Sequence, residues 1–286
     1  MEDESLSENT SGAFLLERFL QLDNWRLLEI GDDIPFDTQL LCPVDDNKLG
    51  VVCTLVAGKG TRNIRIGLCS LCGYTGYIDR PMKEWITEFY AEKWDNAVRQ
   101  NSEAEARVLR DAYLAHGIDP IKQNAKARAK EMRYFLTNNA IPKDKPVLDI
   151  GCGYGLALKF LETLGFTKLY GLENSQHRAH IASAAYGFPL MAGAFEDPKI
   201  QEACHAAGPF GLIMSHHVIE HVYDPQEIIR LASDLQQEGG YLVMSLPDQK
   251  TEPSMETILF FPHLHSFIKR SFVQLLGRYG YEVIDD

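Results

Sequence analysis

The residues VLDIGCGYG, from Val147 to Gly155, join an apolar run to a turn rich in glycine. The apolar run leads into Asp149, and glycine then stands at positions 151, 153 and 155. Because glycine destabilises regular structure by about 0.5–1 kcal/mol relative to alanine, this spacing is typical of a tight turn that follows a strand. Such a turn also allows a ligand to lie against backbone N–H groups.

Downstream of this turn, strand-like and helix-like segments alternate to the end of the sequence. The expected strands are residues 146–151, 168–173, 189–193, 210–216, 241–247 and 281–285, and the expected helices are 156–165, 175–187, 224–240 and 268–280. This alternation predicts an α/β fold with a doubly wound, mostly parallel sheet. In such sheets, ligands bind at the carboxyl ends of the strands, where the glycine-rich turn lies.

The first half of the sequence has a different pattern and suggests further domains. Residues 1–35 read as a polar tail and an amphipathic helix, and 36–81 as a small module with two strands around the turn GKG. Residues 82–141 have helical spacing and are expected to form a connector or cap. The sheet domain would then occupy residues 142–286.

Composition limits the classes of function. Apolar residues make up 45% of the 286-residue chain and charged residues 24%, as in ordinary globular proteins. No apolar run is long enough to span a bilayer, and the acidic N-terminus does not resemble a secretory signal. Six cysteines without an export signal predict a reducing, cytoplasmic setting. The net charge of −12 argues against a nucleic-acid partner.

Two acidic residues indicate the kind of ligand that the turn would bind. Asp149 would repel a pyrophosphate but suits an ammonium group, and Glu173 stands about 20 residues further on, at the end of the second strand. An acid in that position can accept hydrogen bonds from both hydroxyls of a ribose. S-adenosylmethionine has an amino-acid end, a ribose and no phosphate.

Over roughly residues 142–286 the sequence resembles the class I S-adenosylmethionine-dependent methyltransferases. VLDIGCGYG and LYGLENS are similar to their first two motifs, and LIMSHHVIEHVYDPQEIIRLASDLQQEGGYLVMSLPD to their fourth strand, the next helix and the fifth strand. The resemblance places Gly151 and Gly153 beneath the methionine part of the cofactor, Asp149 at its amino end, Glu173 at its ribose and Ser215 beside the methyl donor. Adenine would lie near Ala194–Asp197; because Ala194 replaces an acid that is frequent in the family, Phe195 or Glu196 is expected to make that contact.

The N-terminal cysteines resemble a zinc-ribbon-like module that precedes some small-molecule and sugar methyltransferases. That module carries two C-x-x-C pairs whose thiolates bind zinc tetrahedrally. Here Cys69 and Cys72 form one pair, and Cys42 begins the other, with Asp45 where its second cysteine would be. The resemblance implies zinc held by Cys42, Cys69, Cys72 and either Asp45 or Cys53. The alternative is a metal-free module stabilised by apolar packing.

Histidines gather after the fourth strand of the sheet domain. His216, His217 and His221 are candidates for a general base, since neutral imidazole can take a proton near neutral pH. His217, Glu220 and His221 also have the spacing of one helical face. A second pair, His263 and His265, precedes the last expected helix. Methyltransferases that act on the terminal ribose of small RNAs hold a metal with a similar E-x-x-E-H run and a later histidine, which would make Glu220, His221 and His265 the ligands here. The remaining alternative is that Glu220 and His221 only shape the loop.

The resemblance implies a cytoplasmic enzyme that methylates an oxygen or carbon of a small metabolite, a sugar or glycan precursor, or a natural-product scaffold. The alternatives are an RNA methyltransferase with a cysteine module and a protein that binds S-adenosylmethionine without turnover. Class I sheets finish with a sixth and an antiparallel seventh strand, whereas this sequence stops at YEVIDD. The domain is therefore expected to be incomplete at its C-terminal end.

Overall fold

A computed structural model describes residues 34–57, 62–93, 106–107, 110–111, 135–136, 138–139, 141–249 and 263–284. The helix expected near the N-terminus and most of the helical connector lie outside these residues. The chain divides into two compact units. The antiparallel unit comprises Met1–Ile86, Ile219–Gln226 and Leu246–Ile284, and the parallel unit comprises Thr87–Val218, Glu227–Ser245 and Asp285–Asp286.

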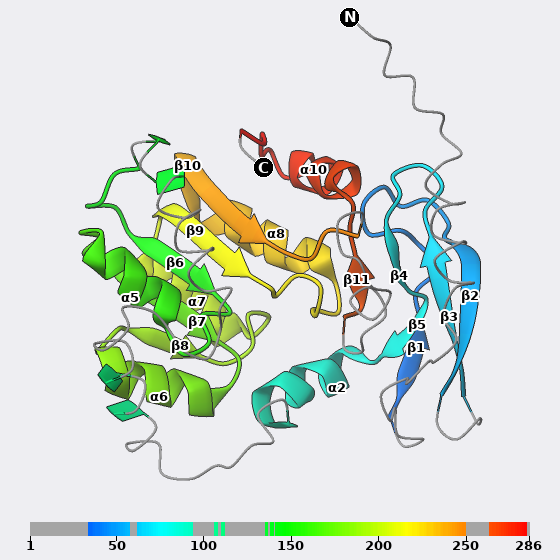
Figure 1. The fold of residues 1–286 in the computed structure, drawn as a ribbon, viewed down its shortest axis with the longest axis horizontal. Coiled ribbons are helices and arrows are strands. Elements are labelled where there is room, and N and C mark those ends of the chain that lie inside the picture. The colour runs from blue at the N-terminus through cyan, green and yellow to red at the C-terminus, as the bar shows by residue number, and fades with distance from the viewer. Residues whose placement is uncertain are drawn as a thin grey trace, which may run out of the picture. The chain divides into compact units, whose positions relative to one another are not determined.

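The parallel unit is built on one five-stranded sheet (Figure 1). Its strands are β6 (Val147–Ile150), β7 (Leu169–Glu173), β8 (Leu190–Ala192), β9 (Phe210–His216) and β10 (Gln236–Ser245). They are all parallel and lie in the order β10-β9-β6-β7-β8. The chain thus adds strands on one side of β6 and then returns to add β9 and β10 on the other, which places a topological switch point at the carboxyl ends of β6 and β9.

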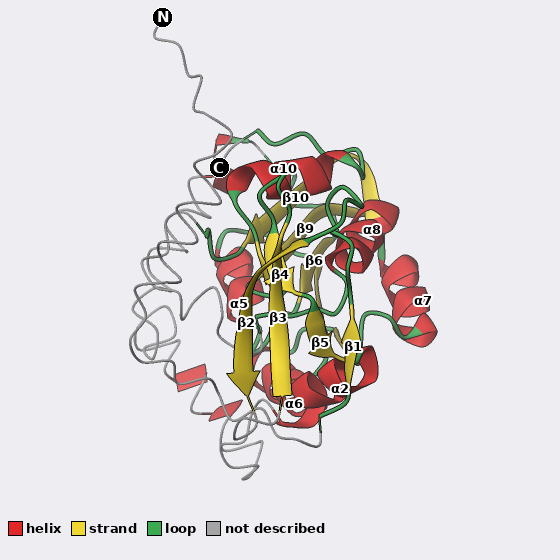
Figure 2. Ribbon diagram, turned by 90° about the vertical axis from the view of Figure 1, so that its right-hand side faces the viewer, coloured by secondary structure: helices red, strands yellow, loops and turns green. Residues whose placement is uncertain are grey.

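Helices cover both faces of this sheet. They are α5 (Leu156–Thr163), α6 (Gln176–Tyr186), α7 (Pro198–Ala207) and α8 (Pro225–Leu235). Helix α5 lies on one face, and α7 and α8 lie on the other (Figure 2). The expected doubly wound parallel sheet is confirmed. Helix α7 was not anticipated from the sequence.

The core of the parallel unit explains why its strands read as continuous apolar runs. All four residues of β6 are buried, and so are the first six of β9. Val147 stands opposite Leu169 on β7 and Leu212 on β9. Leu158 and Leu161 of α5 pack into the same apolar cluster. Because both faces of the sheet are covered, no polar face remains to produce alternation.

Helix ends in the parallel unit follow the capping signals only in part. Ser175, the first residue of the expected helix 175–187, caps α6, and its Oγ accepts a hydrogen bond from the backbone N–H of Arg178 at 3.3 Å. Helix α8 was expected to run to the glycines at 239 and 240, but it ends at Leu235. Strand β10 already begins at Gln236, which stands opposite Phe210 of β9. Pairing with β9 therefore prevails over the helical pattern.

The antiparallel unit contains two small sheets. Strand β1 (Phe36–Thr38) pairs with β5 (Asp79–Pro81), and a four-stranded sheet has the order β11-β4-β3-β2. The members of the larger sheet are β2 (Gly50–Ala57), β3 (Arg62–Leu68), β4 (Thr75–Tyr77) and β11 (His265–Ser266). The two strands expected around the turn GKG are confirmed as β2 and β3. Helix α2 (Lys83–Glu88) follows β5 and continues into the π-helical turn η2 (Phe89–Lys93).

The C-terminal segment belongs to the antiparallel unit. Strand β11 pairs with β4, and helix α10 (Lys269–Gly277) follows it. The strand expected over residues 281–285 is wrong for the described residues 281–284, which form no strand. The backbone N–H of Tyr281 instead bonds the carbonyl of Leu276 at 3.3 Å, so this segment closes the end of α10. The segment after β10 was expected to remain with the parallel sheet.

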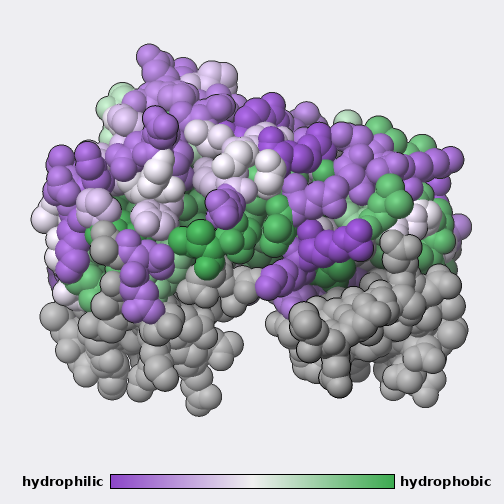
Figure 3. Space-filling model, turned by 90° about the horizontal axis from the view of Figure 1, so that it is seen from above, coloured by the Kyte–Doolittle hydropathy of each residue, from purple (hydrophilic) through white to green (hydrophobic). Residues whose placement is uncertain are grey.

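The described surface is mixed in polarity, and Figure 3 shows hydrophilic areas with smaller hydrophobic ones among them. Every large apolar side chain found exposed among the described residues belongs to the antiparallel unit: Leu40, Leu41, Val51, Val56, Leu71, Met82, Val273 and Ile284. No described helix combines the length and the apolar character that crossing a membrane requires.

Candidate functional site

The glycine-rich turn lies at the switch point of the parallel sheet, directly after β6. Gly151 has φ +75°, and a Cβ there would come within 2.3 Å of Cγ2 of Val218. Gly153 has φ +54°, and a Cβ there would meet nothing within 4 Å. The close contact with Val218 therefore requires glycine at position 151. At position 153 no atom lies where a side chain would be, so a ligand could approach the backbone there. That open backbone is what close approach of a ligand needs.

Glu173 connects this turn to the end of β7. Its Oε2 accepts a hydrogen bond from the backbone N–H of Gly153 at 2.8 Å, and its Oε1 accepts one from Ser175 at 2.9 Å. A carboxylate has about four acceptor positions, so each oxygen can accept a further hydrogen bond. These two hydrogen bonds hold the carboxylate rigidly between the glycine-rich turn and the start of α6.

Asp149 is the second acidic group of the parallel unit at this edge, and it is only 2% exposed. Burial, and after it the negative charge of Glu173, raises the pKa of Asp149 to about 8. Both causes act against ionisation, and a bound cation would act in the opposite direction. The position therefore suits a ligand that brings an ammonium group.

The loop between β8 and α7 carries the residues expected near adenine. The backbone N–H of Gly193 bonds the carbonyl of Glu173 at 2.9 Å, which ties the start of this loop to the end of β7. Phe195 and Glu196 are half-buried. Asp197 is engaged in capping α7, since its Oδ1 accepts from the backbone N–H of Lys199 at 2.9 Å. Phe195 and Glu196 thus remain the candidates for an adenine contact.

The end of β9 supplies the polar groups nearest in register to the glycine-rich turn. Ser215 stands opposite Ile150 of β6, and its buried Oγ has no hydrogen-bond partner among the described residues. Nδ1 of His216 lies 2.8 Å from Oγ of Ser245. His217 has φ +53°, and its backbone N–H bonds the carbonyl of Ser245 at 2.8 Å. Positive φ at a residue other than glycine is concentrated at functional sites, and Ser245 is a neighbour that the sequence did not reveal.

The expected helical face of His217, Glu220 and His221 is wrong. Residues 217–224 form turns rather than a helix, because the positive φ of His217 redirects the chain. His217 belongs to the parallel unit, whereas Glu220 and His221 belong to the antiparallel unit.

His265 has a structural setting within the antiparallel unit. Its Nδ1 lies 2.5 Å from the hydroxyl of Tyr74, and its Nε2 lies 2.8 Å from the carbonyl of Val222. Burial, with the charge of Arg80 as a further cause, holds its pKa well below the usual range. Since both ring nitrogens are engaged, the hypothesis that His265 completes a metal site with Glu220 and His221 is contradicted.

His263, rather than His265, lies close to Glu220 and His221. One ligand atom from each of Glu220, His221 and His263 lies within 4.8 Å of the other two. The ring centroids of the two histidines are 4.5 Å apart, and Nε2 of His221 is 3.8 Å from Oε1 of Glu220. We call these three residues the Glu-His-His cluster.

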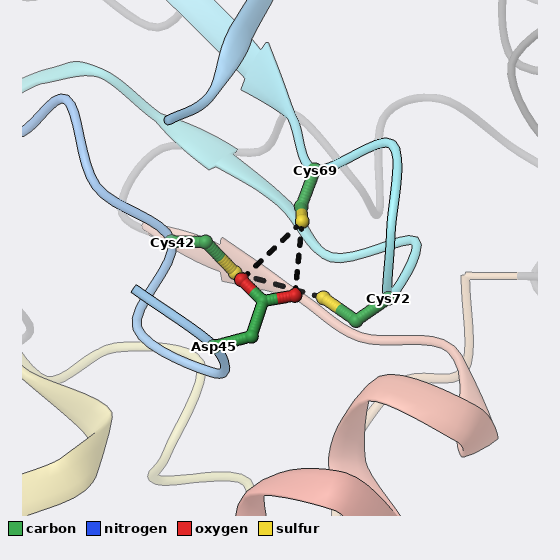
Figure 4. Close-up of side chains that lie close together, drawn as sticks. All are labelled: Cys42, Asp45, Cys69 and Cys72. Carbon is green, nitrogen blue, oxygen red and sulfur yellow. Dashed lines mark hydrogen bonds between the residues drawn. The ribbon is translucent and has the colours of Figure 1, made fainter. Parts of the chain in front are cut away.

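The predicted cysteine module converges on a second cluster, formed by Cys42, Asp45, Cys69 and Cys72, whose side chains point toward one another (Figure 4). The sulfur atoms of Cys42 and Cys72 are 3.6 Å apart, and Sγ of Cys69 lies 3.3 Å from Oδ2 of Asp45. Four sulfurs bound to zinc at about 2.3 Å would stand about 3.8 Å apart, so the spacing fits a tetrahedral ion. Cys53 faces Ile66 across the β2–β3 hairpin, outside this cluster.

Two of the four side chains in the cysteine cluster, Cys72 and Asp45, have lowered pKa values, which favours their anionic forms. The contact between the two thiols raises the pKa of Cys42 and lowers that of Cys72. Burial opposes ionisation of Asp45, but hydrogen bonds from Asn47, Cys42 and Cys69 outweigh it and lower its pKa. Cys152 and Cys204 belong to the parallel unit, are both buried, and are not members of this cluster.

Comparison with known sequences gives a match for the C-terminal part of the chain, which includes the parallel sheet. The model of a family described as "Methyltransferase domain" matches residues 122–286. A curated relative named Ubiquinone biosynthesis O-methyltransferase, from Caulobacter sp. (strain K31), is 32% identical over 99 residues, which are 35% of this chain and 39% of that protein. The enzyme of the same name from Chromobacterium violaceum is 28% identical over 116 residues, or 39% and 48% of the two chains. The matches thus span less than half of the length of these relatives.

Two solved structures are also similar to this chain. Magnesium protoporphyrin IX methyltransferase from Synechocystis PCC 6803 gives a TM-score of 0.47 at 16% identity, covering 71% of this chain and 91% of that one. A SAM-dependent methyltransferase from Archaeoglobus fulgidus gives 0.43 at 18% identity, covering 54% and 69%.

Proposed function

The chain belongs to the family of S-adenosylmethionine-dependent methyltransferases that share this methyltransferase domain, and on that premise we propose that it methylates an oxygen atom of a small molecule. The names of the curated relatives support O-methylation of a small acceptor. The net charge of −12 supports an acceptor other than a nucleic acid. The observation that carries the proposal is the Glu173 carboxylate, fixed between the backbone N–H groups of Gly153 and Ser175.

The cofactor site that we propose uses the residues at the carboxyl edge of the parallel sheet. S-adenosylmethionine, when bound, supplies an electrophilic methyl group. Glu173 would bind the ribose hydroxyls, and Asp149 the ammonium group. The bare backbone at Gly153 would allow close approach, and the Ser215 hydroxyl offers a buried polar contact without a partner of its own among the described residues. Phe195 and Glu196 would face the adenine.

This assignment is tested directly by transfer assays. The protein is incubated with S-adenosylmethionine carrying a labelled methyl group and with a panel of small phenols and polyols. We expect a methyl ether to appear in the mass spectrum of at least one acceptor class. Label found only on nitrogen or carbon of an acceptor would contradict O-methylation, and label found only on added RNA would contradict the small-molecule assignment.

Replacing Glu173 by Ala should weaken the binding of S-adenosylhomocysteine by about 10- to 150-fold, because hydrogen bonds to a charged group contribute about 1.5–3 kcal/mol. Titration calorimetry measures this change. The control is Glu202→Ala, which removes an exposed carboxylate of α7 and should leave the affinity unchanged. Unchanged affinity in a folded Glu173→Ala protein, or tighter binding of a nicotinamide dinucleotide than of S-adenosylhomocysteine, would exclude the proposed site.

His217 is the residue that we propose as general base. In this role its neutral imidazole takes the proton that the acceptor hydroxyl loses as the carbon–oxygen bond forms. The backbone bond to Ser245 and the positive φ hold this residue in one orientation at the end of β9. A general base acts only in its unprotonated form, so turnover that uses this residue is expected to depend on pH.

The base is tested with His217→Asn, because asparagine tolerates positive φ and cannot take the proton. We expect kcat to fall about 10²- to 10⁴-fold, with loss of the pH dependence, while the affinity for S-adenosylhomocysteine stays the same. His216→Asn is the matched control and should retain the wild-type pH profile. A full rate in the His217→Asn protein would show that catalysis rests on positioning alone.

We also propose that the cysteine cluster holds one structural zinc ion through Cys42, Asp45, Cys69 and Cys72. Three sulfurs and one oxygen supply the four ligands of a closed structural site. All three cysteines are buried, as is usual for a site that stabilises a fold rather than one that exchanges ligands.

A further inference from the structure

We propose that the Glu-His-His cluster, formed by Glu220, His221 and His263, is a second metal site and binds a divalent transition-metal ion. All three residues belong to the antiparallel unit. None of them belongs to the cysteine cluster or to the proposed cofactor site, so this assignment does not depend on the identity of the methyl acceptor.

Backbone hydrogen bonds bring the two segments of this cluster together. The carbonyl of Glu220 accepts from the N–H groups of Leu264 at 2.8 Å and of His265 at 3.2 Å. The ring of His265 is fixed in turn by Tyr74 and by the carbonyl of Val222. These contacts fix the backbone next to His263 and next to His221. The cluster is therefore organised by the fold rather than by chance contact of flexible side chains.

The three ligand atoms lie close enough together for one ion to contact all of them. Nitrogen and oxygen ligands bound at about 2.0–2.2 Å stand about 3.4 Å apart in a tetrahedral site. Nε2 of His221 is 3.8 Å from Oε1 of Glu220, beyond hydrogen-bonding distance, and the three ligand atoms lie within 4.8 Å of one another. The two imidazole rings meet edge to face, at 69°, with centroids 4.5 Å apart.

Burial adds an electrostatic reason for a cation. Glu220 is 1% exposed and its Oε1 lies 3.8 Å from Nε2 of His221, so a cation bound here would be attracted by a carboxylate that solvent does not screen. His221 and His263 are half-buried, which leaves a path for an ion and for its remaining ligands. A divalent cation would compensate the carboxylate without requiring that either histidine be protonated.

The donor set indicates the class of ion. Two imidazoles and one carboxylate suit zinc, iron, cobalt or manganese better than magnesium or calcium, which prefer oxygen ligands. Three protein ligands leave at least one coordination position open, for water or for an anionic oxygen. The cysteine cluster has four donors and offers no such position. The two sites are therefore expected to differ in ligand exchange as well as in ion preference.

The test uses the full chain loaded with zinc and then treated with a chelator mild enough to empty an open three-ligand site but not a closed four-ligand site, so that only the cysteine cluster is filled, and cobalt(II) is the probe. We expect about one further cobalt ion per chain, with the weak visible bands of nitrogen and oxygen ligation and without thiolate-to-cobalt charge transfer. His263→Ala and Glu220→Gln should each weaken this binding at least tenfold. His205→Ala, an exposed histidine of α7, is the control and should bind cobalt as the wild type does.

A second measurement uses the wild-type protein, so the result does not depend on how the variants fold. Cobalt should protect His221 and His263, and leave His205 unprotected, against modification by diethyl pyrocarbonate, as mapped by mass spectrometry. The proposal is overturned if added cobalt leaves His221 and His263 as reactive as before. It is equally overturned if the cobalt spectrum shows thiolate ligation only, or if folded His263→Ala protein binds the ion with wild-type affinity.

Discussion

Replacing Asp149 by Asn should weaken the binding of S-adenosylhomocysteine about 100-fold and, at the same time, stabilise the ligand-free protein above neutral pH. Binding suffers because the ammonium group of the ligand loses its only proposed carboxylate partner. Stability improves because the wild-type carboxyl is buried beside Glu173 and resists ionisation. A residue that serves only the fold would not change these two quantities in opposite directions.

The sign of the stability change follows from the pKa of Asp149, which is raised from 3.8 to about 8 in the folded protein. Between these values the folded state keeps a proton that the unfolded chain releases. The contribution to stability is thus complete below about pH 4 and is lost as the pH rises toward 8, at about 1.4 kcal/mol per pH unit. The amide in the Asp149→Asn variant does not titrate, so the variant should gain about 2 kcal/mol on the wild type between pH 6 and pH 7.5.

Chemical denaturation at several pH values measures the change in stability, and calorimetry measures the change in affinity. Wild-type affinity for S-adenosylhomocysteine should increase with pH over the same range, since the ligand binds the ionised carboxylate, and binding should release a proton to the buffer. Asp144→Asn, an exposed carboxyl before β6, is the control and should change neither quantity. A parallel loss of stability and affinity in Asp149→Asn would mean that the carboxyl is needed by the fold and not by the ligand.

Changing Cys69 to Ser should remove one zinc ion per chain and unfold the antiparallel unit. Structural zinc in small domains contributes about 10–16 kcal/mol of apparent binding free energy, more than the usual stability of a domain. Cys69 contributes one of only four donors, so its loss leaves an open and weak site. Elemental analysis of the purified protein and a thermal melt with and without a chelator measure the two consequences.

The matched control for this experiment is Cys53→Ser. Cys53 lies on β2, outside the cysteine cluster, so this variant should keep its zinc and its melting temperature. Asp45→Asn should bind zinc more weakly, because the carboxylate is replaced by a neutral amide. Wild-type protein that is free of metal and melts identically with and without chelator would establish the alternative, a module held by apolar packing.

Local pattern predicted the parallel sheet well because its strands are buried on both faces. Strand β9 occupies the expected residues 210–216, and the expected places of Asp149 and Glu173 toward the ends of β6 and β7 follow from the same alternation. These features depend on contacts within a short window of sequence. The sequence alone therefore indicates where their carboxylates lie and which groups of a ligand they suit.

The features that pattern did not predict depend on distant parts of the chain. Strand β11 has two residues and no periodicity, and it exists because β4 offers it an edge. His263 and His265 are two positions apart, and the sequence did not indicate which of them would contact Tyr74 and which would lie beside His221. The fourth member of the cysteine cluster was decided by the turn that carries Asp45, whereas pairing with β3 carries Cys53 away.

The pairing of β11 with β4 has a consequence for how the protein is made. A chain leaves the ribosome from its N-terminus, and domains usually fold in that order. The last strand of the parallel sheet ends at Ser245, whereas the four-stranded sheet that begins with Gly50 is complete only at Ser266. The unit that is synthesised first is therefore finished last. During translation one edge of β4 therefore stays unpaired while the whole parallel sheet is synthesised and can fold.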